Sequence, residues 1–425
     1  MFTNLGCKLN QAELEDLARR FSGSGHQVVG SIEEAELHVV NTCTVTHGAA
    51  RDSRKTARRG GRLNPALRTV LTGCYVESDP IEAAALAGVD LIVPNRDKEN
   101  LLERVHSAFP ELRPTQDRPV RLDVPYVPLE FGNSRALVKI EDGCNMQCSF
   151  CIIPSTRGPQ RSREPRDVVR DVERLVAAGF PEIVITGVQI SSYQSDGLGL
   201  FELTSRLLEE TDVERLRLTS IAPWQFDSRL LDLLPGRRLC RHFHLSLQSG
   251  CDQTLRRMRR PYSSEQFASL TRRIRQAAPD TAITTDVIVG FPGETVAEFE
   301  ASLAFVESQG FARVHAFPYS ERPGTAAAAL AGKIAPPETR SRMQRMLAIA
   351  GRSEAEFAAG QIGRTVSVLW EARRDRVWRG TSDNYLRVST TSDSDLERTL
   401  APAYLTSVDG AIVSAGPAAP VLQEA

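Results

Sequence analysis

The sequence predicts an α/β protein of three parts: an N-terminal parallel α/β domain, a central partial (βα)6 barrel and a small C-terminal all-β barrel. Strand and helix patterns alternate along the N-terminal part and again from Ala136 to about Ala350. Such alternation is typical of parallel sheets with crossover helices. After Gly360, short strands separated by turns replace the helices, as in small barrels.

The elements of the first two parts follow from apolar periodicity. In the N-terminal part we expect strands at Phe2–Leu5, Leu37–Val40 and Thr69–Leu71, and helices at Gln11–Phe21, Ile81–Ala87 and Asn100–Phe109. In the central part we expect strands at Leu137–Ile140, Glu182–Thr186, Leu216–Thr219, Phe243–Leu247, Thr284–Val289 and Arg313–Phe317, with helices at stretches such as Asp167–Ala178, Leu200–Glu210 and Glu298–Ser308. Six βα units in the central part favour a partial barrel, and a flat doubly wound sheet is the alternative.

Proline and turn residues mark the boundaries between the parts. A stretch containing Pro110, Pro114, Pro119, Pro125 and Pro128 predicts a linker after the first domain. The C-terminal strands are expected at Thr365–Trp370, Tyr385–Ser389 and Ala411–Ser414. We therefore expect domains at residues 1–115, 130–358 and 360–425, which suits a chain of 425 residues.

The composition is that of an ordinary globular protein, with 41% hydrophobic residues, 25% charged residues and a formal net charge of −1. The longest apolar runs are too short to span a bilayer, and the N-terminus lacks the apolar core of a signal peptide. We therefore expect a cytoplasmic protein, a monomer, without a membrane partner. Eight cysteines in a reducing compartment are more often metal or cluster ligands than disulfide partners.

Positive charge is concentrated in two stretches, although the chain as a whole is nearly neutral. The basic residues are Arg51, Arg54, Lys55, Arg58, Arg59, Arg62 and Arg68 in the first stretch, and Arg256, Arg257, Arg259 and Arg260 in the second. Solvated helix faces and a phosphate-binding track explain this pattern equally well.

Cys144, Cys148 and Cys151 directly follow the first predicted strand of the central part. Three thiolates on one short loop can bind three irons of a [4Fe–4S] cluster and leave the fourth iron open. An open iron can bind the amino and carboxylate groups of S-adenosyl-L-methionine (SAM), which the cluster then reduces. A zinc site this compact normally has a fourth Cys or His nearby, and none follows in this loop.

Cys7, Cys43 and Cys74 form a second set, separated by 36 and 31 residues, about one βα unit each. Each follows a predicted strand, and the carboxyl ends of parallel strands lie along one edge of a sheet, where ligands bind. The set can therefore converge on a second cluster; three independent buried cysteines are the alternative. Cys240 and Cys251 show no such pattern, and we interpret them as core residues.

Further motifs accompany the cysteines along nearly the whole chain. They are Gly6–Asn10 with Glu13, Asn41–Thr46, Gly73–Tyr75, Asp142–Cys151, Ile153–Gly158, Ser162–Arg163, His244–Gly250, Asp286–Glu294, Phe317–Ser320 with Gly324–Thr325, and Ser382–Leu386. Together they resemble the radical SAM methylthiotransferase family. The last motif is similar to that family's TRAM domain, a small RNA-binding barrel.

The resemblance implies two [4Fe–4S] clusters and two equivalents of SAM. One SAM would methylate a sulfur held by the cluster of Cys7, Cys43 and Cys74. The other would be cleaved at the second cluster, giving a 5′-deoxyadenosyl radical that abstracts hydrogen from adenine C2, where the methylthio group is inserted. The implied partners are a tRNA substrate, a reducing electron donor and an unidentified sulfur donor.

The family modifies isopentenyladenosine in tRNA, threonylcarbamoyladenosine in tRNA, or an aspartate of a ribosomal protein. The Gly-Cys-Lys-x-Asn form of Gly6–Asn10, the run Asn41–Thr46 and the stretch Cys240–His244 resemble the threonylcarbamoyladenosine branch. Methylthiolation of that nucleoside, next to the anticodon, is thus the predicted function, and the other two branches are alternatives. A non-catalytic Fe–S electron carrier or RNA-binding module is a further alternative, which would need neither the open irons nor a full barrel.

The resemblance and the strand ends also suggest SAM contacts, at Gly187, Gln189, Gln248, Ser249, Ile288 and Gly290. The first two match the positions that contact the methionine end of SAM in the family. Ile288 and Gly290 offer an apolar surface for adenine, although Ile288 is explained equally well as a core strand residue. Ala222 departs from the family, because relatives commonly carry glutamate there.

Arginines near the cluster loop and in the C-terminal part are candidates for RNA contacts. Arg157, Arg161 and Arg163 suit phosphate, although Arg163 could equally pair with an internal carboxylate. Residues 360–425 carry seven arginines and eight acidic residues. We therefore expect a local positive face, or RNA contacts concentrated in one hairpin that carries Arg373, Arg374, Arg376 and Arg379.

Overall fold

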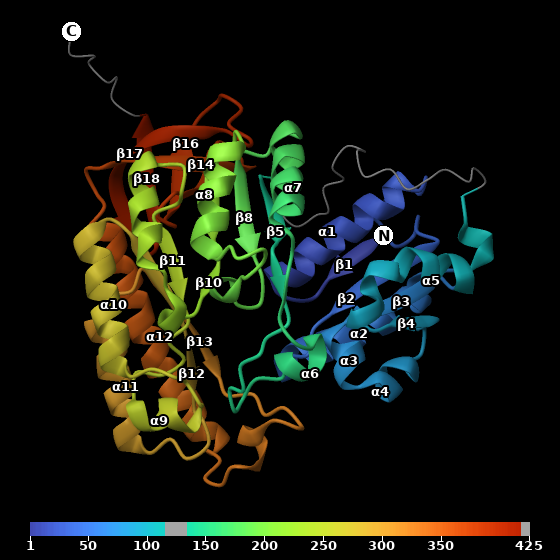
Figure 1. Cartoon of the computed structure of the whole chain (residues 1–425), viewed down its shortest axis with the longest axis horizontal. Coiled ribbons are helices and arrows are strands. Elements are labelled where there is room, and N and C mark those ends of the chain that lie inside the picture. The colour runs from blue at the N-terminus through green and yellow to red at the C-terminus, as the bar shows by residue number, and fades with distance from the viewer. Residues whose placement is uncertain (115–133, 418–425) are drawn as a thin grey trace.

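The computed structural model describes residues 1–114 and 134–417, which form three units (Figure 1). An N-terminal sheet with its helices lies beside a larger curved sheet, and the last strands form a barrel at one end of that larger sheet. The predicted linker falls mainly on residues 115–133, outside the described residues. Among the helices of the described part, none is long and apolar enough to cross a membrane.

The N-terminal unit is a four-stranded parallel sheet covered by helices. Its strands pair in chain order: β1 (Phe2–Asn4), β2 (Leu37–Thr42), β3 (Arg68–Gly73) and β4 (Leu91–Val93). The segments between and after them are α1 (Lys8–Gly23), α2 (His47–Leu63), α3 (Cys74–Ser78), α4 (Pro80–Ala84), η1 (Asn95–Asn100), α5 (Leu101–Ala108) and η2 (Pro110–Leu112). Leu14, Leu17 and Phe21 of α1 belong to one core with Val39 and Val70 of the sheet. The predicted βα alternation is confirmed.

Several elements of this unit have no counterpart among the predicted ones, β4 and α2 among them. Strand β4 is only three residues long. Helix α2 buries only small residues such as Ala50 and Ala57 and exposes its arginines. Its apolar face is therefore too narrow to give a periodic signal.

The six strands predicted for the central part are all present and parallel. Their order is β5 (Arg135–Lys139), β8 (Glu182–Thr186), β9 (Arg215–Leu218), β11 (His242–Leu245), β12 (Ala282–Val289) and β13 (Arg313–Pro318). The short strand β10 (Ser220–Ile221) and a bridge between Leu216 and Leu239 connect β9 to β11. In the described part of the chain the pairing stops at β5 and β13, and α1 packs against β5 on this open side (Figure 1). The predicted partial barrel is thus confirmed.

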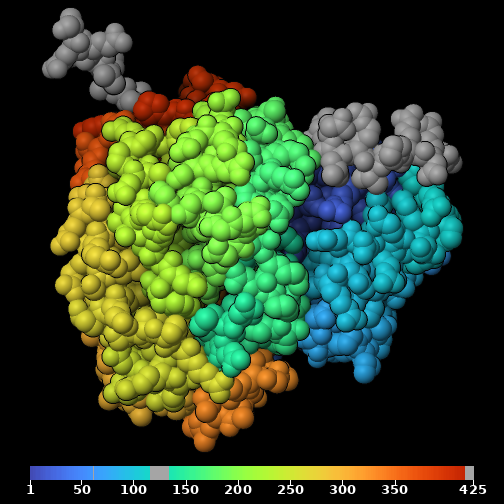
Figure 2. All heavy atoms as spheres, viewed as in Figure 1, coloured from blue at the N-terminus to red at the C-terminus, as the bar shows by residue number. Residues whose placement is uncertain are grey.

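Helices cover the outside of this partial barrel, and Figure 2 shows how the N-terminal unit packs against its β5 edge. The remaining elements are β6 (Glu141–Asp142), α6 (Ile153–Arg157), β7 (Arg161–Ser162), α7 (Pro165–Ala177), η3 (Ile190–Ser192), α8 (Leu200–Glu210), η4 (Pro223–Gln225), η5 (Ser228–Gly236), α9 (Asp252–Arg257), α10 (Ser264–Ala277), α11 (Val296–Ser308), η6 (Ala326–Ala329) and α12 (Pro336–Ala359).

Alternate residues of the barrel strands differ in polarity. Ile183, Leu216, Phe243 and Val314 belong to the core that the strands form with the surrounding helices. Because neighbouring strand residues point to opposite faces, the residues between them face the inside of the barrel. Many of these are polar, and we call them the polar lumen: Arg135, Glu182, Arg215, Arg217, His242, His244, Thr284, Asp286, Arg313 and His315.

The C-terminal unit is a closed five-stranded barrel, which confirms the predicted small all-β barrel, although only three of its strands were expected. Its strands are β14 (Thr365–Arg374), β15 (Val377–Ser382), β16 (Arg387–Thr391), β17 (Leu400–Asp409) and β18 (Ile412–Pro417), paired in the order β14-β15-β16-β18-β17. Val368, Trp370, Trp378, Val388 and Leu405 fill its interior.

The C-terminal barrel closes the floor of the polar lumen. Arg215 and Arg217 bind the carboxylate of Glu182, with Nε–O distances of 2.6 and 2.7 Å, and they also donate to backbone carbonyls of the C-terminal barrel. Tyr385, held at φ 69°, stacks its ring on His242 at a centroid distance of 4.1 Å. Burial alone would raise the pKa of Glu182, but the surrounding arginines hold it well below its ordinary value of 4.5. This carboxylate therefore stabilises the fold above pH 4.5, and the contribution is lost as the solution becomes more acidic.

Glu182→Gln is expected to destabilise the protein by about 3–5 kcal/mol, because it leaves two buried guanidinium groups without a counter-charge. Thermal unfolding measures the loss, and hydrogen exchange should locate it in β14 and β15. Glu307→Gln is the matched control, because Glu307 forms an exposed ion pair with Arg352 at 2.7 Å; its cost is expected to stay below about 1 kcal/mol. Equal losses for the two variants would contradict a structural role of the buried pair.

Candidate functional site

The loop that carries Cys144, Cys148 and Cys151 lies between β6 and α6, at the carboxyl end of β5. The amide of Cys144 donates to the carbonyl of Gly158 at 3.1 Å, and the amide of Cys151 donates to that of Cys148 at 3.1 Å. Gly143 has φ 71°, and a Cβ there would lie 2.0 Å from the carbonyl oxygen of Pro159. The backbone therefore folds the loop back on itself and places the three thiols together.

The charges of these thiols act on one another. Burial raises the pKa of Cys151 to about 12, and the neighbouring Cys148 and Cys144 raise it further. Burial is also the first cause of the raised pKa of Cys144. Such thiols stay protonated at neutral pH unless a metal displaces the proton.

The second set lies at the carboxyl edge of the N-terminal sheet, as predicted. Cys7 follows β1 and caps α1, Cys43 follows β2, and Cys74 follows β3 and begins α3. Cys43 and Cys74 are buried and Cys7 is exposed. Burial raises the pKa of Cys43 to about 11, and the charges of Cys74 and Cys7 add to this effect. The structure thus brings the three thiols within electrostatic range of one another.

The glycine before Cys74 is required by this packing. Gly73 has φ 103°, and a Cβ there would lie 2.3 Å from the carbonyl oxygen of Thr42. Any larger residue would separate β2 from β3 at the point where both cysteines leave the sheet.

The two cysteine sets lie on opposite sides of one interface, where α3 packs against α6. The side-chain amide of Asn95 donates to the carbonyl of Thr156 at 2.8 Å and to the sulfur of Cys74 at 3.9 Å. The guanidinium of Arg322 donates to the carbonyl of Thr44 at 2.9 Å, next to Cys43. Contacts on two sides therefore hold the sets face to face.

The donor sets suit iron–sulfur clusters better than single ions. Within residues 1–114 and 134–417, no three His, Cys, Asp or Glu side chains are grouped closely enough to hold one metal ion. A cubane cluster needs a wider arrangement, because each thiolate binds a different iron. Three thiolates without a fourth protein ligand also leave one iron open for a substrate.

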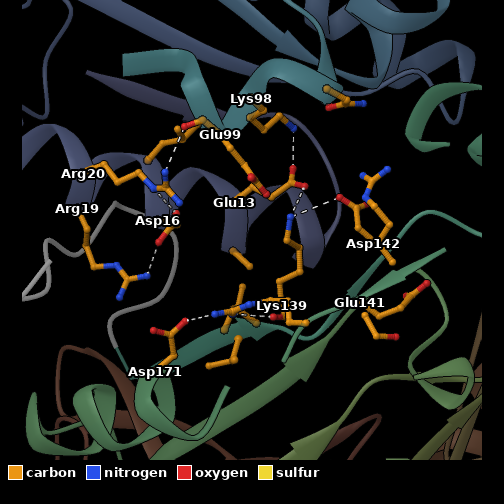
Figure 3. Close-up of a pocket in the computed structure, with 18 of the residues that line it drawn as sticks. Glu13, Asp16, Arg19, Arg20, Lys98, Glu99, Lys139, Glu141, Asp142 and Asp171 are labelled. Carbon is orange, nitrogen blue, oxygen red and sulfur yellow. Dashed lines mark hydrogen bonds and ion pairs between the residues drawn. The ribbon is translucent and has the colours of Figure 1, made fainter. Parts of the chain in front are cut away.

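A buried ion network joins the two domains beside the cysteines. The carboxylate of Glu13 accepts from Lys98 at 2.6 Å, from Lys139 at 3.4 Å and from Arg157 at 2.8 Å. Figure 3 shows Lys98 and Lys139 pointing at Glu13 from opposite sides. Burial would raise the pKa of Glu13, but Lys98, Arg157 and Lys139 hold it well below its ordinary range. Arg157 also donates to Asp142 at 2.9 Å, so one network spans both domains.

A cavity of about 560 Å³ lies in the same seam, between α1, η1 and β5 (Figure 3). None of the six clustered cysteines lines it. Several of its charged residues are paired, for example Asp16 with Arg20 at 2.8 Å and Asp171 with Arg163 at 2.7 Å. The cavity is therefore a solvated part of the domain interface and not the place where the thiols meet.

The arginines after the cluster loop divide into three cases. The prediction that Arg157 contacts RNA is wrong, because its side chain is only 2% exposed and binds Glu13 and Asp142. For Arg163, the alternative of an internal carboxylate is confirmed by the ion pair with Asp171. Arg161 is exposed, as a phosphate contact requires.

The two predicted SAM residues after β8 lie beside a buried carboxylate. A Cβ on Gly187 would lie 2.9 Å from Oε2 of Glu141, and the amide of Gln189 donates to the same oxygen at 3.0 Å. Burial raises the pKa of Glu141 to about 7. The neighbouring Ala222 is buried, and its amide donates to the hydroxyl of Ser191 at 2.9 Å.

The other predicted SAM residues lie around the ends of β11 and β12. Gln248 has φ 71°. Its backbone amide donates to the backbone carbonyl of Asp286, and its backbone carbonyl accepts from the backbone amide of Ile288. Ser249 is buried and accepts from the amide of Cys251 at 3.2 Å. Gly290 has φ 77°, and its amide donates to Glu294 at 2.9 Å.

One residue of the site had no assigned role in the sequence. Arg260 donates to the sulfur of Cys148 at 3.4 Å and to the hydroxyl of Ser246 at 2.9 Å, and its guanidinium lies 4.6 Å from the ring centre of Trp224. The only sequence signal was its place in a run of arginines. Such a run looks like a solvated face, because its partners lie far away in the chain.

Basic surfaces are exposed at two places. Helix α2 exposes Arg51, Lys55, Arg58, Arg59 and Arg62, and the hairpin of β14 and β15 exposes Arg373, Arg374, Arg376 and Arg379. Both surfaces are open to an anionic partner, and the exposure of α2 fits both interpretations of its charge run, a solvated helix face and a phosphate-binding track.

Two protein-family models match the chain: the Radical SAM superfamily over residues 138–306 and the uncharacterized protein family UPF0004 over residues 1–94. The threonylcarbamoyladenosine tRNA methylthiotransferase MtaB of Bacillus subtilis is 34% identical, over 93% of this chain and 91% of its own length. The enzyme of the same name from Aquifex aeolicus is 35% identical, over 87% of this chain and 92% of its own length. A tRNA-2-methylthio-N(6)-dimethylallyladenosine synthase of Geobacillus thermodenitrificans is 33% identical, over 86% of this chain and 72% of its own length.

Among solved structures, the radical S-adenosylmethionine methyltransferase TsrM from Kitasatospora setae is similar in fold. It matches 77% of this chain and 76% of its own chain with a TM-score of 0.59 and 18% identity. The similarity supports the fold over 77% of this chain.

Glu13→Gln is expected to loosen the contact between the two domains, because Lys98 and Arg157 lose a buried counter-charge. We expect a loss of about 3–5 kcal/mol in stability, together with faster hydrogen exchange in η1 and α6. Asp16→Asn, on the same helix, is the matched control, because Asp16 is half-exposed and binds Arg20 on the surface. Unchanged exchange in η1 and α6 of the Glu13 variant would contradict the proposed bridge.

Proposed function

Because the chain belongs to the radical SAM methylthiotransferase family, we propose that it transfers a methylthio group to C2 of N6-threonylcarbamoyladenosine in tRNA. The observation that carries the proposal is that two cysteine triplets face each other across one domain interface. A single triplet would suit radical generation alone. The second triplet supplies what sulfur insertion needs in addition.

The relatives also favour this nucleoside. The two relatives named for threonylcarbamoyladenosine match this chain over 91% and 92% of their own lengths, against 72% for the relative named for dimethylallyladenosine. This chain therefore corresponds to the former in its whole architecture. Its tRNA substrate, an electron donor and a sulfur donor are the partners that such a reaction requires.

The six cysteines would hold two clusters. A [4Fe–4S] cluster and SAM follow from the Radical SAM superfamily match, and Cys144, Cys148 and Cys151 are its proposed ligands. We assign Cys7, Cys43 and Cys74 to a second cluster. When bound, these groups would supply one open iron for reductive cleavage of SAM and another for carrying the sulfur.

The chain's own residues tune and shape this site. The hydrogen bond from Arg260 withdraws electron density from the Cys148 sulfur, which favours the reduced state of a group bound there. A Cβ on Gly187 would lie 2.9 Å from Oε2 of Glu141, and one on Gly290 would lie 3.0 Å from Oγ1 of Thr339, so both glycines allow close packing of the strand ends. We propose that the methionine end of SAM binds at Gly187 and Gln189, and that Gln248, Ser249, Ile288 and Gly290 border the rest of the cofactor.

The exposed arginines give the tRNA backbone two places to bind, on α2 and on the β14–β15 hairpin. Both lie outside the polar lumen, as contacts to phosphate require when the nucleoside itself enters the site. Binding through these arginines would weaken steeply with salt.

The substrate assignment predicts a defined loss in a deletion strain. Digested tRNA from that strain should lack 2-methylthio-N6-threonylcarbamoyladenosine and accumulate the unmodified precursor, as measured by liquid chromatography and mass spectrometry. A plasmid with the wild-type gene should restore the product, whereas Cys144→Ala should not. Unaltered methylthio-nucleosides in the deletion strain would overturn the proposal. If the methylthio derivative of isopentenyladenosine were lost instead, the protein would be assigned to the isopentenyladenosine branch of the family.

Iron content tests the two-cluster assignment. Reconstituted protein should bind about eight irons, and alanine at Cys7, Cys43 and Cys74 together should reduce this to about four. Alanine at Cys144, Cys148 and Cys151 should have the same effect on the other cluster. Cys240→Ala is the control, because Cys240 is a buried cysteine outside both sets. If the first triple variant retains all its iron, the N-terminal cluster does not exist.

A further inference from the structure

The polar lumen is a second feature of the barrel, separate from the cysteines, that the reaction as described leaves without a role. Most of its charges are paired. Glu182 neutralises Arg215 and Arg217, Arg135 binds Glu371, and Arg313 binds Glu354 at 2.6 Å. Asp286 accepts from His244 at 3.1 Å.

Lys8 brings one more positive charge to the lumen from another domain. It is the first residue of α1, the helix that packs against β5 at the open side of the barrel (Figure 1). The charges of Tyr385, Arg217, Arg135 and Glu182 act on Lys8. Its own charge acts on His242, His315 and Tyr385. These residues belong to β11, β13 and the C-terminal barrel, so Lys8 lies within electrostatic range of the lumen, on the open side where α1 packs against β5 and β8.

Within residues 1–114 and 134–417, the ammonium group of Lys8 has no hydrogen-bond or ion-pair partner. The residue is exposed. It is therefore a cation that a ligand inside the barrel can reach.

The walls next to Lys8 also offer open polar groups. Thr284 bonds to His242 at 2.9 Å and to His244 at 3.0 Å, and His244 bonds to Asp286. The side chains of Asp286 and His244 remain 31% and 15% exposed, so both can be reached from the lumen. This lining suits a substituent with hydrogen-bond donors and acceptors. An apolar substituent would offer these side chains no hydrogen-bond partner.

We propose that the polar lumen selects the nucleoside through its N6 substituent, with Lys8 binding the carboxylate of the threonylcarbamoyl group. The inference rests on the proposed function and deepens it, because it names the residue that determines the substrate. The threonylcarbamoyl group carries a carboxylate, a hydroxyl and ureido N–H groups. The isopentenyl group carries none of these and would leave the Lys8 charge and the His244–Asp286 pair without partners.

The experiment compares three anticodon stem–loop RNAs that differ only in one nucleoside: threonylcarbamoyladenosine, its methyl ester, or isopentenyladenosine. The methyl ester removes the negative charge and retains the shape. Binding is measured by fluorescence anisotropy with reconstituted full-length protein, so that affinity is read without turnover. Lys8→Met removes the cation, Lys8→Arg retains it, and Lys333→Met is the matched control, because Lys333 is an exposed lysine paired with Glu321.

Wild-type protein is expected to bind the acid about ten- to a hundredfold more tightly than the ester, as one charged hydrogen bond predicts. Lys8→Met should lose that factor for the acid and bind the ester as wild type does, whereas Lys8→Arg and Lys333→Met should keep the preference. The iron content of each Lys8 variant is measured in parallel, to verify that the substitution does not change iron binding at the neighbouring Cys7.

Other outcomes are distinguishable. If Lys8→Met still prefers the acid to the ester as strongly as wild type does, the role of Lys8 is excluded while the proposed function stands. If wild-type protein binds the isopentenyl RNA more tightly than the acid, the proposed function itself fails, and the inference fails with it.

Discussion

The guanidinium of Arg157 donates to Glu13 of the N-terminal domain at 2.8 Å and to Asp142 of the barrel at 2.9 Å, and it also reaches Asn10 at 2.5 Å. A buried guanidinium has a fixed planar set of donors, so its partners must keep fixed positions to satisfy it. Arg157 ends α6, which follows directly from the loop of Cys144–Cys151, and Glu13 lies two turns into α1, which begins after Cys7. The ion network thus sets the distance and the angle between the two cysteine sets. The proposed transfer of sulfur from one set to a radical formed at the other depends on this geometry.

The alternation along the barrel strands produces a second constraint. Apolar residues face the helices, so polar residues face inward, where each charge needs a partner. The floor obtains part of these partners from the C-terminal barrel, whose backbone carbonyls accept from Arg215 and Arg217. Tyr385 completes the floor by stacking on His242 in a left-handed backbone conformation. The C-terminal barrel therefore forms part of the wall of the polar lumen.

Sequence periodicity was sufficient for the six main strands of the central barrel, because alternation and run length are local properties, but it missed β4, β15 and β17. It also placed Cys7, Cys43 and Cys74 together, since strand ends of a parallel sheet share an edge. It failed for Arg157 and Arg260, whose partners Glu13 and Cys148 lie more than a hundred residues away in the chain. An arginine that binds a buried carboxylate has the same local sequence context as one that binds phosphate. Only the packing of α6 against the N-terminal domain distinguishes them.

Overall similarity cannot determine which nucleoside is modified, because relatives named for two different nucleosides are 34% and 33% identical to this chain. Both carry out methylthio chemistry, so the residues that serve the cysteines are shared between them. Discrimination must come from a small number of side chains that touch what differs between the substrates, namely the N6 substituent. A barrel interior is suited to this task, because a buried charge without a partner costs far more than a mismatch at the surface. Lys8 combines the two properties required: it lies within electrostatic range of the lumen charges, and within the described structure it has no ion-pair partner of its own.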